Sequence, residues 1–132
     1  MHEFTESAIE DIFLNYPEKL GDSLLQMREI IFQVAAQQDI QIMETLRWWQ
    51  PSYLPIQSKV GTTICIDQFS ECEVAIFFNC KTTIVEELKE TFGTSLRYSK
   101  NRAVIFNINT PLPMQTIEYS VALGLSYFKR KK

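Results

Sequence analysis

Residues 71–79 read ECEVAIFFN and form the most strand-like stretch of the chain. Val74 and Ile76 alternate with Ala75 and Phe77, and successive side chains of a strand point to opposite faces of its sheet. A strand here therefore carries apolar side chains on both faces. The pattern predicts a strand that is at least partly covered on each side.

Two further stretches, VGTTICID at 60–67 and RAVIFNIN at 102–109, alternate in the same way. An antiparallel sheet with one wet face needs polar residues at every second position. Here the second face still carries Cys65 and Ile105 in addition to the alanine and phenylalanine above. We therefore predict an antiparallel sheet whose second face needs an apolar cover.

The segment ETLRWWQPSYLP at 44–55 is the best candidate for that cover, because it holds both tryptophans of the chain, Trp48 and Trp49. Pro51 and Pro55 lack a backbone N–H, which argues against a regular central strand there. We expect the paired rings to form a lid on the second face, or one wall of a cleft beside it. The candidate ligand-binding residues are Trp48, Trp49, Pro51, Tyr53 and Phe77.

Helical periodicity surrounds these strands. We predict helices at 5–15 and 17–38, a helix at 82–92 between two strands, and a C-terminal helix from Pro113 that includes Phe128. No linker or repeat interrupts the chain. The expectation is one α+β domain over residues 1–132, in two layers, with an antiparallel sheet packed against N-terminal and C-terminal helices.

The formal net charge is −3 and the isoelectric point about 5.2, which argues against a nucleic-acid partner. The charge is uneven: residues 1–66 carry a net −5 and residues 67–132 a net +2. No run of about 18 apolar residues predicts a membrane span. Three cysteines without CxxC spacing fit a reducing compartment, so we expect a cytoplasmic protein. We also expect that it does not bind membranes.

Several catalytic classes lack their residues. The only histidine is His2, at a terminus that we expect to fray, so a histidine-based triad or metal site is excluded. The four glycines form no phosphate-binding loop. No resident cofactor is predicted.

The stretch YPEKLGDSLLQMREII, the run ETLRWWQPSY and the later EVAIFFN, LRYSKNRAVIFNI and PLPMQTIEYSVALGL stretches resemble the YdhG-like domain family over residues 16–128. Glu44, Trp48, Pro51 and Tyr53 match its signature loop. Trp49 and Gln50 stand where the family has glycine and methionine, so a pocket seen in relatives would be filled by Trp49. The resemblance implies a compact α+β fold, and the family is largely of unknown function.

Some members of that family are described as frataxin-like iron chaperones, which makes intracellular iron binding the first alternative. Iron would be held by exposed carboxylates of the first helix, and Glu6 and Glu10 share one helical face. The candidate metal ligands are Glu6, Glu10 and Asp11. Acids near a helix N-terminus are also what a solvated face carries.

NCKTT at 79–83 supplies the second alternative, a cysteine-dependent enzyme. Cys80 is expected between a strand and a helix, where a helix N-terminus and Lys81 would lower the pKa of its thiol. The same turn, through Lys81, Thr82 and Thr83, would bind a small anion. Arg97, Lys100 and Arg102 would add charge if the fold brings them near.

The leading hypothesis is a non-enzymatic binding module whose site lies beside the aromatic loop. Its partner would be a small molecule or a protein, since tryptophan and tyrosine suit both ligand walls and interface hot spots. The sequence leaves the oligomeric state open.

Overall fold

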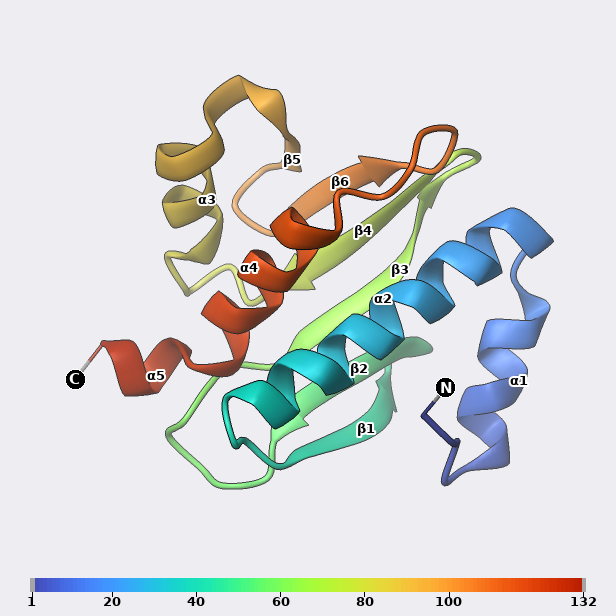
Figure 1. Ribbon diagram of the computed structural model, residues 1–132, viewed down its shortest axis with the longest axis horizontal. Helices are drawn as coiled ribbons and strands as arrows, with labels where there is room; N and C mark the ends of the chain where they lie inside the picture. Colours follow the sequence, from blue (N-terminus) through green and yellow to red (C-terminus); the bar gives the residue numbers. More distant parts are fainter. Residues whose placement is uncertain (1, 132) are drawn as a thin grey trace.

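The computed structural model describes residues 2–131 and shows an α+β fold in two layers (Figure 1). The helices are α1 (Ser7–Asn15), α2 (Glu18–Gln37), α3 (Ile84–Phe92), the 3-10 turn η1 (Gly93–Ser95), α4 (Met114–Leu125) and α5 (Tyr127–Arg130). The strands are β1 (Ile42–Arg47), β2 (Gln50–Pro55), β3 (Ile64–Ser70), β4 (Glu73–Phe78), β5 (Arg97–Ser99) and β6 (Ala103–Asn107).

The strands form one sheet in the order β1-β2-β3-β4-β6-β5, and every neighbouring pair is antiparallel. This confirms the predicted fold class. Sequence alternation missed β5, which has only three residues, and merged α5 into the preceding helix. None of the helices in residues 2–131 is long and apolar enough to cross a membrane.

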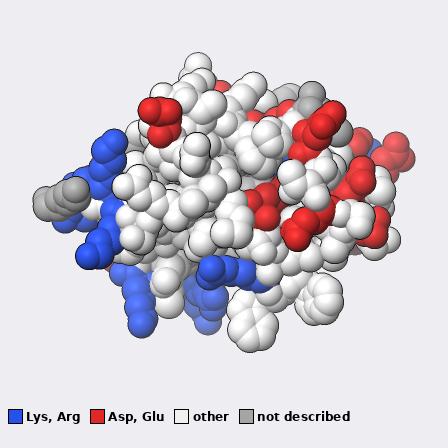
Figure 2. All heavy atoms as spheres, turned by 90° about the horizontal axis from the view of Figure 1, so that it is seen from below, with Lys and Arg blue, Asp and Glu red and all other residues white. Residues whose placement is uncertain are grey.

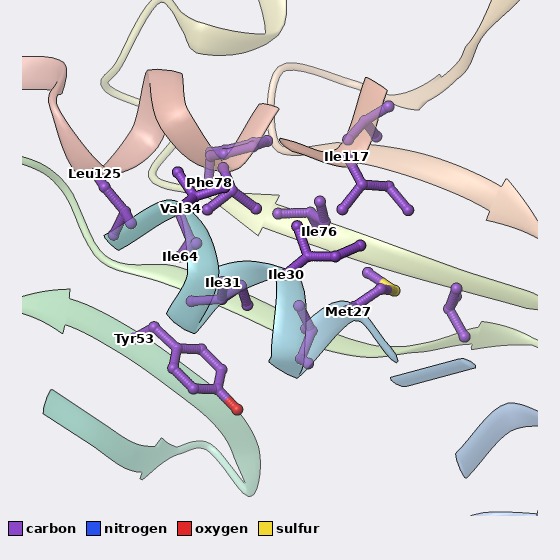
Figure 3. Close-up of a cluster of buried hydrophobic side chains, with 14 of the residues drawn as sticks. Met27, Ile30, Ile31, Val34, Tyr53, Ile64, Ile76, Phe78, Ile117 and Leu125 are labelled. Atoms are coloured by element: carbon purple, nitrogen blue, oxygen red, sulfur yellow. The ribbon is translucent and has the colours of Figure 1, made fainter. Parts of the chain in front are cut away.

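The main core lies between the helices and one face of the sheet, which we call the covered face (Figure 1). Figure 3 shows its centre, where Ile30 and Ile31 of α2 meet Ile64 of β3 and Ile76 of β4, with Leu125 of α4 alongside. Residues of α1 and α3 belong to the same cluster. All four longer helices therefore pack on one side of the sheet.

The first three predicted helix starts are one or two residues early. Pro17 precedes α2 instead of opening it, and its carbonyl accepts a hydrogen bond from the Gly21 N–H at 2.8 Å. The first helix begins at Ser7 and the third at Ile84. These shifts are within the usual uncertainty of helix boundaries.

The prediction that the prolines prevent a strand at 50–55 is wrong. β2 pairs along its full length with β1, from Arg47–Gln50 to Ile42–Pro55. With β3 it pairs only through Ser52 and Tyr53, which lie between the two prolines. A proline removes one ladder donor, and this strand places both of them outside its short pairing with β3.

The other side of the sheet, which we call the open face, carries the small second apolar cluster. Ala75, Ala103 and Ile105 are buried there, with Phe77 packed against them. The Arg97–Glu73 ion pair reaches across β6 beside this cluster. The predicted apolar second face thus exists, and its members are covered by neighbouring side chains of the sheet.

The predicted indole lid over that cluster is wrong. The side chains of Trp48 and Trp49 are 93% and 78% exposed, and neither belongs to the second cluster. They sit at the tip of the β1–β2 hairpin, beyond the last strand pair, Arg47–Gln50. The alternative form of the prediction places the indole rings at one wall of a cleft beside the second face.

Candidate functional site

A groove of about 570 Å³ crosses the open face, from the hairpin tip to the loops that follow β4 and β5. We call it the open-face groove. Ligand sites for small molecules usually measure roughly 300–1,000 Å³, so its size suits a small molecule. Its lining residues are Arg47, Trp48, Gln50, Thr63, Cys65, Phe77, Phe78, Asn79, Cys80, Ser99, Lys100 and Arg102.

One end of the groove is the two-residue turn Trp48–Trp49. Both residues have positive φ, 54° and 65°, which a type I′ hairpin turn requires at its two central positions. Such turns normally carry Asn-Gly, because a Cβ atom disfavours the left-handed region. The two largest side chains of the chain thus occupy a conformation that their own backbone preferences oppose.

A chain of hydrogen bonds fixes this end to the rest of the protein. The Gln50 side-chain amide donates to Asp67 Oδ2 at 2.9 Å, and the Tyr16 hydroxyl donates to Asp67 Oδ1 at 2.7 Å. Burial, followed by the contact with Asp67, holds the pKa of Tyr16 well above its ordinary value. Tyr16 therefore remains a hydrogen-bond donor. Through Asp67 of β3, it connects the end of α1 to Gln50 at the start of β2.

The other end of the groove is built where two loops meet. Asn101 Nδ2 donates to the Cys80 carbonyl at 3.0 Å and to the Thr82 carbonyl at 3.4 Å. The Phe78 N–H donates to the Arg102 carbonyl. These bonds hold the β5–β6 turn, with Lys100 in the left-handed region at φ 52°, beside the loop that carries Cys80.

Three cations line the groove: Arg47 at the hairpin end, and Lys100 and Arg102 at the other. Among residues 2–131, none of them has a carboxylate partner within ion-pair distance. Arg97, which the sequence grouped with Lys100 and Arg102, is instead paired with Glu73. Figure 2 shows the wider pattern, with basic side chains toward the α5 end and acidic ones toward the α1 end.

Two thiols line the groove and differ in setting. Burial raises the pKa of Cys65, while its contact with Ser52 Oγ at 3.2 Å and the charge of Arg47 act in the opposite direction. Cys65 is therefore a neutral thiol at neutral pH. Cys80 is exposed, and within residues 2–131 its sulfur has no hydrogen-bond partner.

The predicted ligand residues divide between the two faces of the sheet. Trp48 and Phe77 line the open-face groove, which agrees with the cleft-wall prediction. Trp49 is not among the lining residues and points to solvent, so it fills no pocket. Pro51 and Tyr53 are buried on the covered face, because side chains alternate along β2, and they have no access to the groove.

Tyr53 belongs to a buried polar cluster on the covered face. Arg28, fully buried in α2, donates through Nε and Nη2 to the two carboxylate oxygens of Glu44 at 2.6 and 3.0 Å. The Tyr53 hydroxyl donates to the same carboxylate at 2.7 Å. Phe4 stacks on the guanidinium, with its ring centroid 3.8 Å away. Glu44 and Tyr53, which match the expected signature loop, thus form a paired structural cluster.

The anion site predicted at Lys81, Thr82 and Thr83 is not available. The Lys81 N–H donates to Asn79 Oδ1, the Thr82 N–H to the Asn79 carbonyl, and the Thr83 N–H to the Tyr127 hydroxyl. The backbone N–H groups that an anion would need at these three residues are already used. The turn therefore shapes one end of the groove without binding a ligand through these groups.

The metal ligands predicted in α1 do not come together as a site. Within the described chain, no three His, Cys, Asp or Glu side chains lie close enough to hold a metal ion, Glu6, Glu10 and Asp11 included. The expectation that His2 frays is also wrong. Its N–H donates to the Glu29 carboxylate at 2.8 Å, and its ring stacks on Phe32.

A second hollow, of about 670 Å³, lies at the far end of the β2–β3 loop. Its lining contains the carboxylate of Asp39 beside Lys59 and Lys129, and no aromatic ring. We regard the open-face groove as the better candidate, since its lining combines aromatic rings with three cations and contains no acidic residue.

Sequence reasoning named Trp48, Phe77 and Cys80 as candidates and suggested that Lys100 and Arg102 would be near Cys80. Neither Arg47 nor Cys65 was among its candidate site residues. Comparison of the chain with protein-family models, with curated proteins and with solved structures finds no match. The resemblance to the YdhG-like family stays a prediction, and function must be argued from the groove.

Proposed function

We propose that this protein is a non-enzymatic binding module that takes a small anionic ligand in the open-face groove. The observation that carries the proposal is the set of three lining cations, Arg47, Lys100 and Arg102, without an acidic partner in the described chain. What distinguishes the groove is that three cations share one lining that contains no acidic residue, whereas Arg28 and Arg130 each face a carboxylate, of Glu44 and Glu87.

The distribution of these cations also favours a ligand. Arg47 is the last residue of β1, while Lys100 and Arg102 lie in the β5–β6 turn, so the two charged ends come from opposite edges of the sheet. Like charges facing one groove repel one another unless an anion sits between them. Side-chain and backbone donors of Asn79 and Ser99 line the same space and can complete the recognition of an anion.

Binding is favoured over catalysis by the chemistry of the lining. It contains neither a carboxylate nor a histidine to act as a general base. Burial raises the pKa of the Cys65 thiol and keeps it protonated at neutral pH, and the Cys80 sulfur has no hydrogen-bond partner in residues 2–131. The iron-chaperone alternative finds no comparable support, because the acids of α1 do not converge.

The proposal is tested by titrating the 15N-labelled chain with inorganic phosphate, pyrophosphate and citrate while recording amide shifts. We expect saturable shifts at Cys65, Cys80 and the 99–102 turn, and weaker binding as salt is added, because the attraction is electrostatic. Arg102→Gln and Lys100→Asn should each weaken the tightest-binding anion at least about fivefold. Asparagine is chosen at Lys100 because it tolerates the left-handed region.

Lys19→Gln is the matched control, since it removes one exposed positive charge from α2, away from the groove. It should leave the affinity within about twofold of the parent protein. If the groove variants and the control weaken binding equally, the effect is one of net charge and the proposed site is wrong. Linear, non-saturating shifts with all three anions would reject the function itself.

A further inference from the structure

We infer that the anion carries an aromatic ring and that Trp48 is the surface on which this ring stacks. The inference rests on the proposed function and adds the chemical class of the ligand. It depends on three features of the hairpin tip: the exposure and backbone conformation of Trp48, the rigidity of the turn, and the free faces of the rings around the groove.

The conformation of the tip is the first observation. Trp48 is 93% exposed and has φ 54°, so its indole gains almost no burial from the fold while its backbone adopts a region that bulky residues avoid. Neither packing nor turn chemistry explains the residue. Backbone outliers of this kind concentrate at ligand sites, where a bound partner supplies the compensating contacts.

The tip is also held in place before any ligand arrives. β1 and β2 pair at six successive positions up to Arg47–Gln50. The Gln50–Asp67–Tyr16 hydrogen bonds then fix the base of the turn to β3 and α1. A preorganised aromatic surface loses little conformational entropy on binding, which is what a stacking platform requires.

The rings around the groove have free faces. Nine phenylalanine and tyrosine rings and His2 make ring–ring contacts in the described chain, and cations lie over Phe4, Phe32, Tyr98 and Tyr127. Trp48 and Phe77 take part in none of these contacts. Phe77 is half-buried in the floor of the groove, and Trp48 stands at its wall.

Together these features describe the ligand. An anionic group is attracted to the guanidinium of Arg47, which directly precedes Trp48, or to the cations at the far end. A planar ring attached to that group reaches the free face of the indole or the phenylalanine floor, where stacking adds affinity. An aryl phosphate, an aromatic carboxylate and a mononucleotide share this chemistry.

Because Trp48 and Trp49 are the only tryptophans, intrinsic fluorescence reports on this tip alone. We expect phenyl phosphate to quench the emission saturably and to bind at least about fivefold more tightly than cyclohexyl phosphate, which has similar size and charge without a π face. AMP and benzoate, titrated in parallel, distinguish a nucleotide from an aromatic acid as the better ligand.

Two variants locate the stacking surface. Trp48→Asn, which suits the left-handed turn, should still bind both phosphates by NMR and lose the preference for the phenyl ring. Trp49→Asn is the matched control, since Trp49 shares the turn but does not line the groove, and it should keep that preference. Loss of the preference in Trp49→Asn alone would overturn the assignment to Trp48.

The outcomes separate the two proposals. Equal affinity for phenyl and cyclohexyl phosphate, with saturable binding of both, would overturn the aromatic inference and leave the anion-binding function in place. Failure of every anion to bind would reject the proposed function, and the inference with it. Folding of each variant is checked by the dispersion of its amide spectrum, which the exposed tip should not disturb.

Discussion

On the covered face of the sheet, Arg28 donates two hydrogen bonds to one carboxylate, and Tyr53 donates a third. On the open face, Arg47, Lys100 and Arg102 line a groove without any carboxylate partner in the described chain. Cationic side chains therefore occur in two settings: Arg28 is hydrogen-bonded to a carboxylate, and among residues 2–131 the cations of the groove have none. The difference supports a structural role for the covered cluster and the proposed ligand-binding role for the open set.

Among the variants that test this comparison, Arg28→Ala is expected to have the largest effect on stability. It leaves the Glu44 carboxylate, whose side chain is only 5% exposed, without its cationic partner in the interior. We expect the free energy of unfolding to fall by about 3–5 kcal/mol, because an unpaired buried charge is strongly unfavourable. Urea unfolding followed by far-ultraviolet circular dichroism measures it. A loss below about 1 kcal/mol would show that water reaches this cluster.

Tyr53→Phe tests the same cluster with a smaller change. It removes one donor to Glu44, and we expect a loss of about 1–3 kcal/mol at neutral pH. The comparison variant is Tyr119→Phe, on the exposed side of α4, which should change stability by less than about 0.5 kcal/mol.

The pH dependence of the parent protein sharpens this prediction. Burial, and then the charge of Glu44, holds the pKa of Tyr53 well above 10.0. Above pH 10 the unfolded tyrosine loses its proton while the folded one keeps it, so the unfolded state binds fewer protons and stability falls as pH rises. Each such tyrosine contributes about 1.4 kcal/mol per pH unit in this window. Tyr53→Phe should reduce the slope of unfolding free energy between pH 10 and 11 by that amount.

At the hairpin tip beside the open face, substitution is expected to raise the free energy of unfolding instead of lowering it. Replacing Trp48 and Trp49 by Asn and Gly gives the turn its preferred residues, and both positions have positive φ. We expect the free energy of unfolding to rise by about 1–2 kcal/mol, since left-handed backbone is costly for bulky residues. The variant has no tryptophan, so unfolding is followed by far-ultraviolet circular dichroism. A loss of stability instead would mean that the indoles pack in the fold.

The smallest effect is expected for the cations of the groove. Arg102→Gln removes an exposed side chain without a carboxylate partner and should change the free energy of unfolding by less than about 0.5 kcal/mol. Against Arg28→Ala, this gives a contrast of several kcal/mol between two arginines of one chain. A loss above 1 kcal/mol for Arg102→Gln would remove the distinction between the two faces.

Much of the fold could be predicted from periodicity. Apolar residues at every second position identified β3, β4 and β6, and the helical stripe from Leu20 to Val34 identified α2. β2 was missed because two prolines argue against a paired strand, and only the register shows that they flank its short pairing with β3. Trp48 and Trp49 were expected to cover the second face or to form one wall of a cleft beside it, while a two-residue hairpin turn holds both of them in solvent.

The sequence by itself determined the strands β3, β4 and β6, the four longer helices and the apolar character of both faces of the sheet, because these follow from local side-chain periodicity. Only the tertiary structure decided which face the helices cover, that Arg28 meets Glu44 sixteen residues away, and that Arg47, Lys100 and Arg102 line one groove. Those outcomes depend on the strand order β1-β2-β3-β4-β6-β5, and contacts between distant segments leave no periodic signal in the chain.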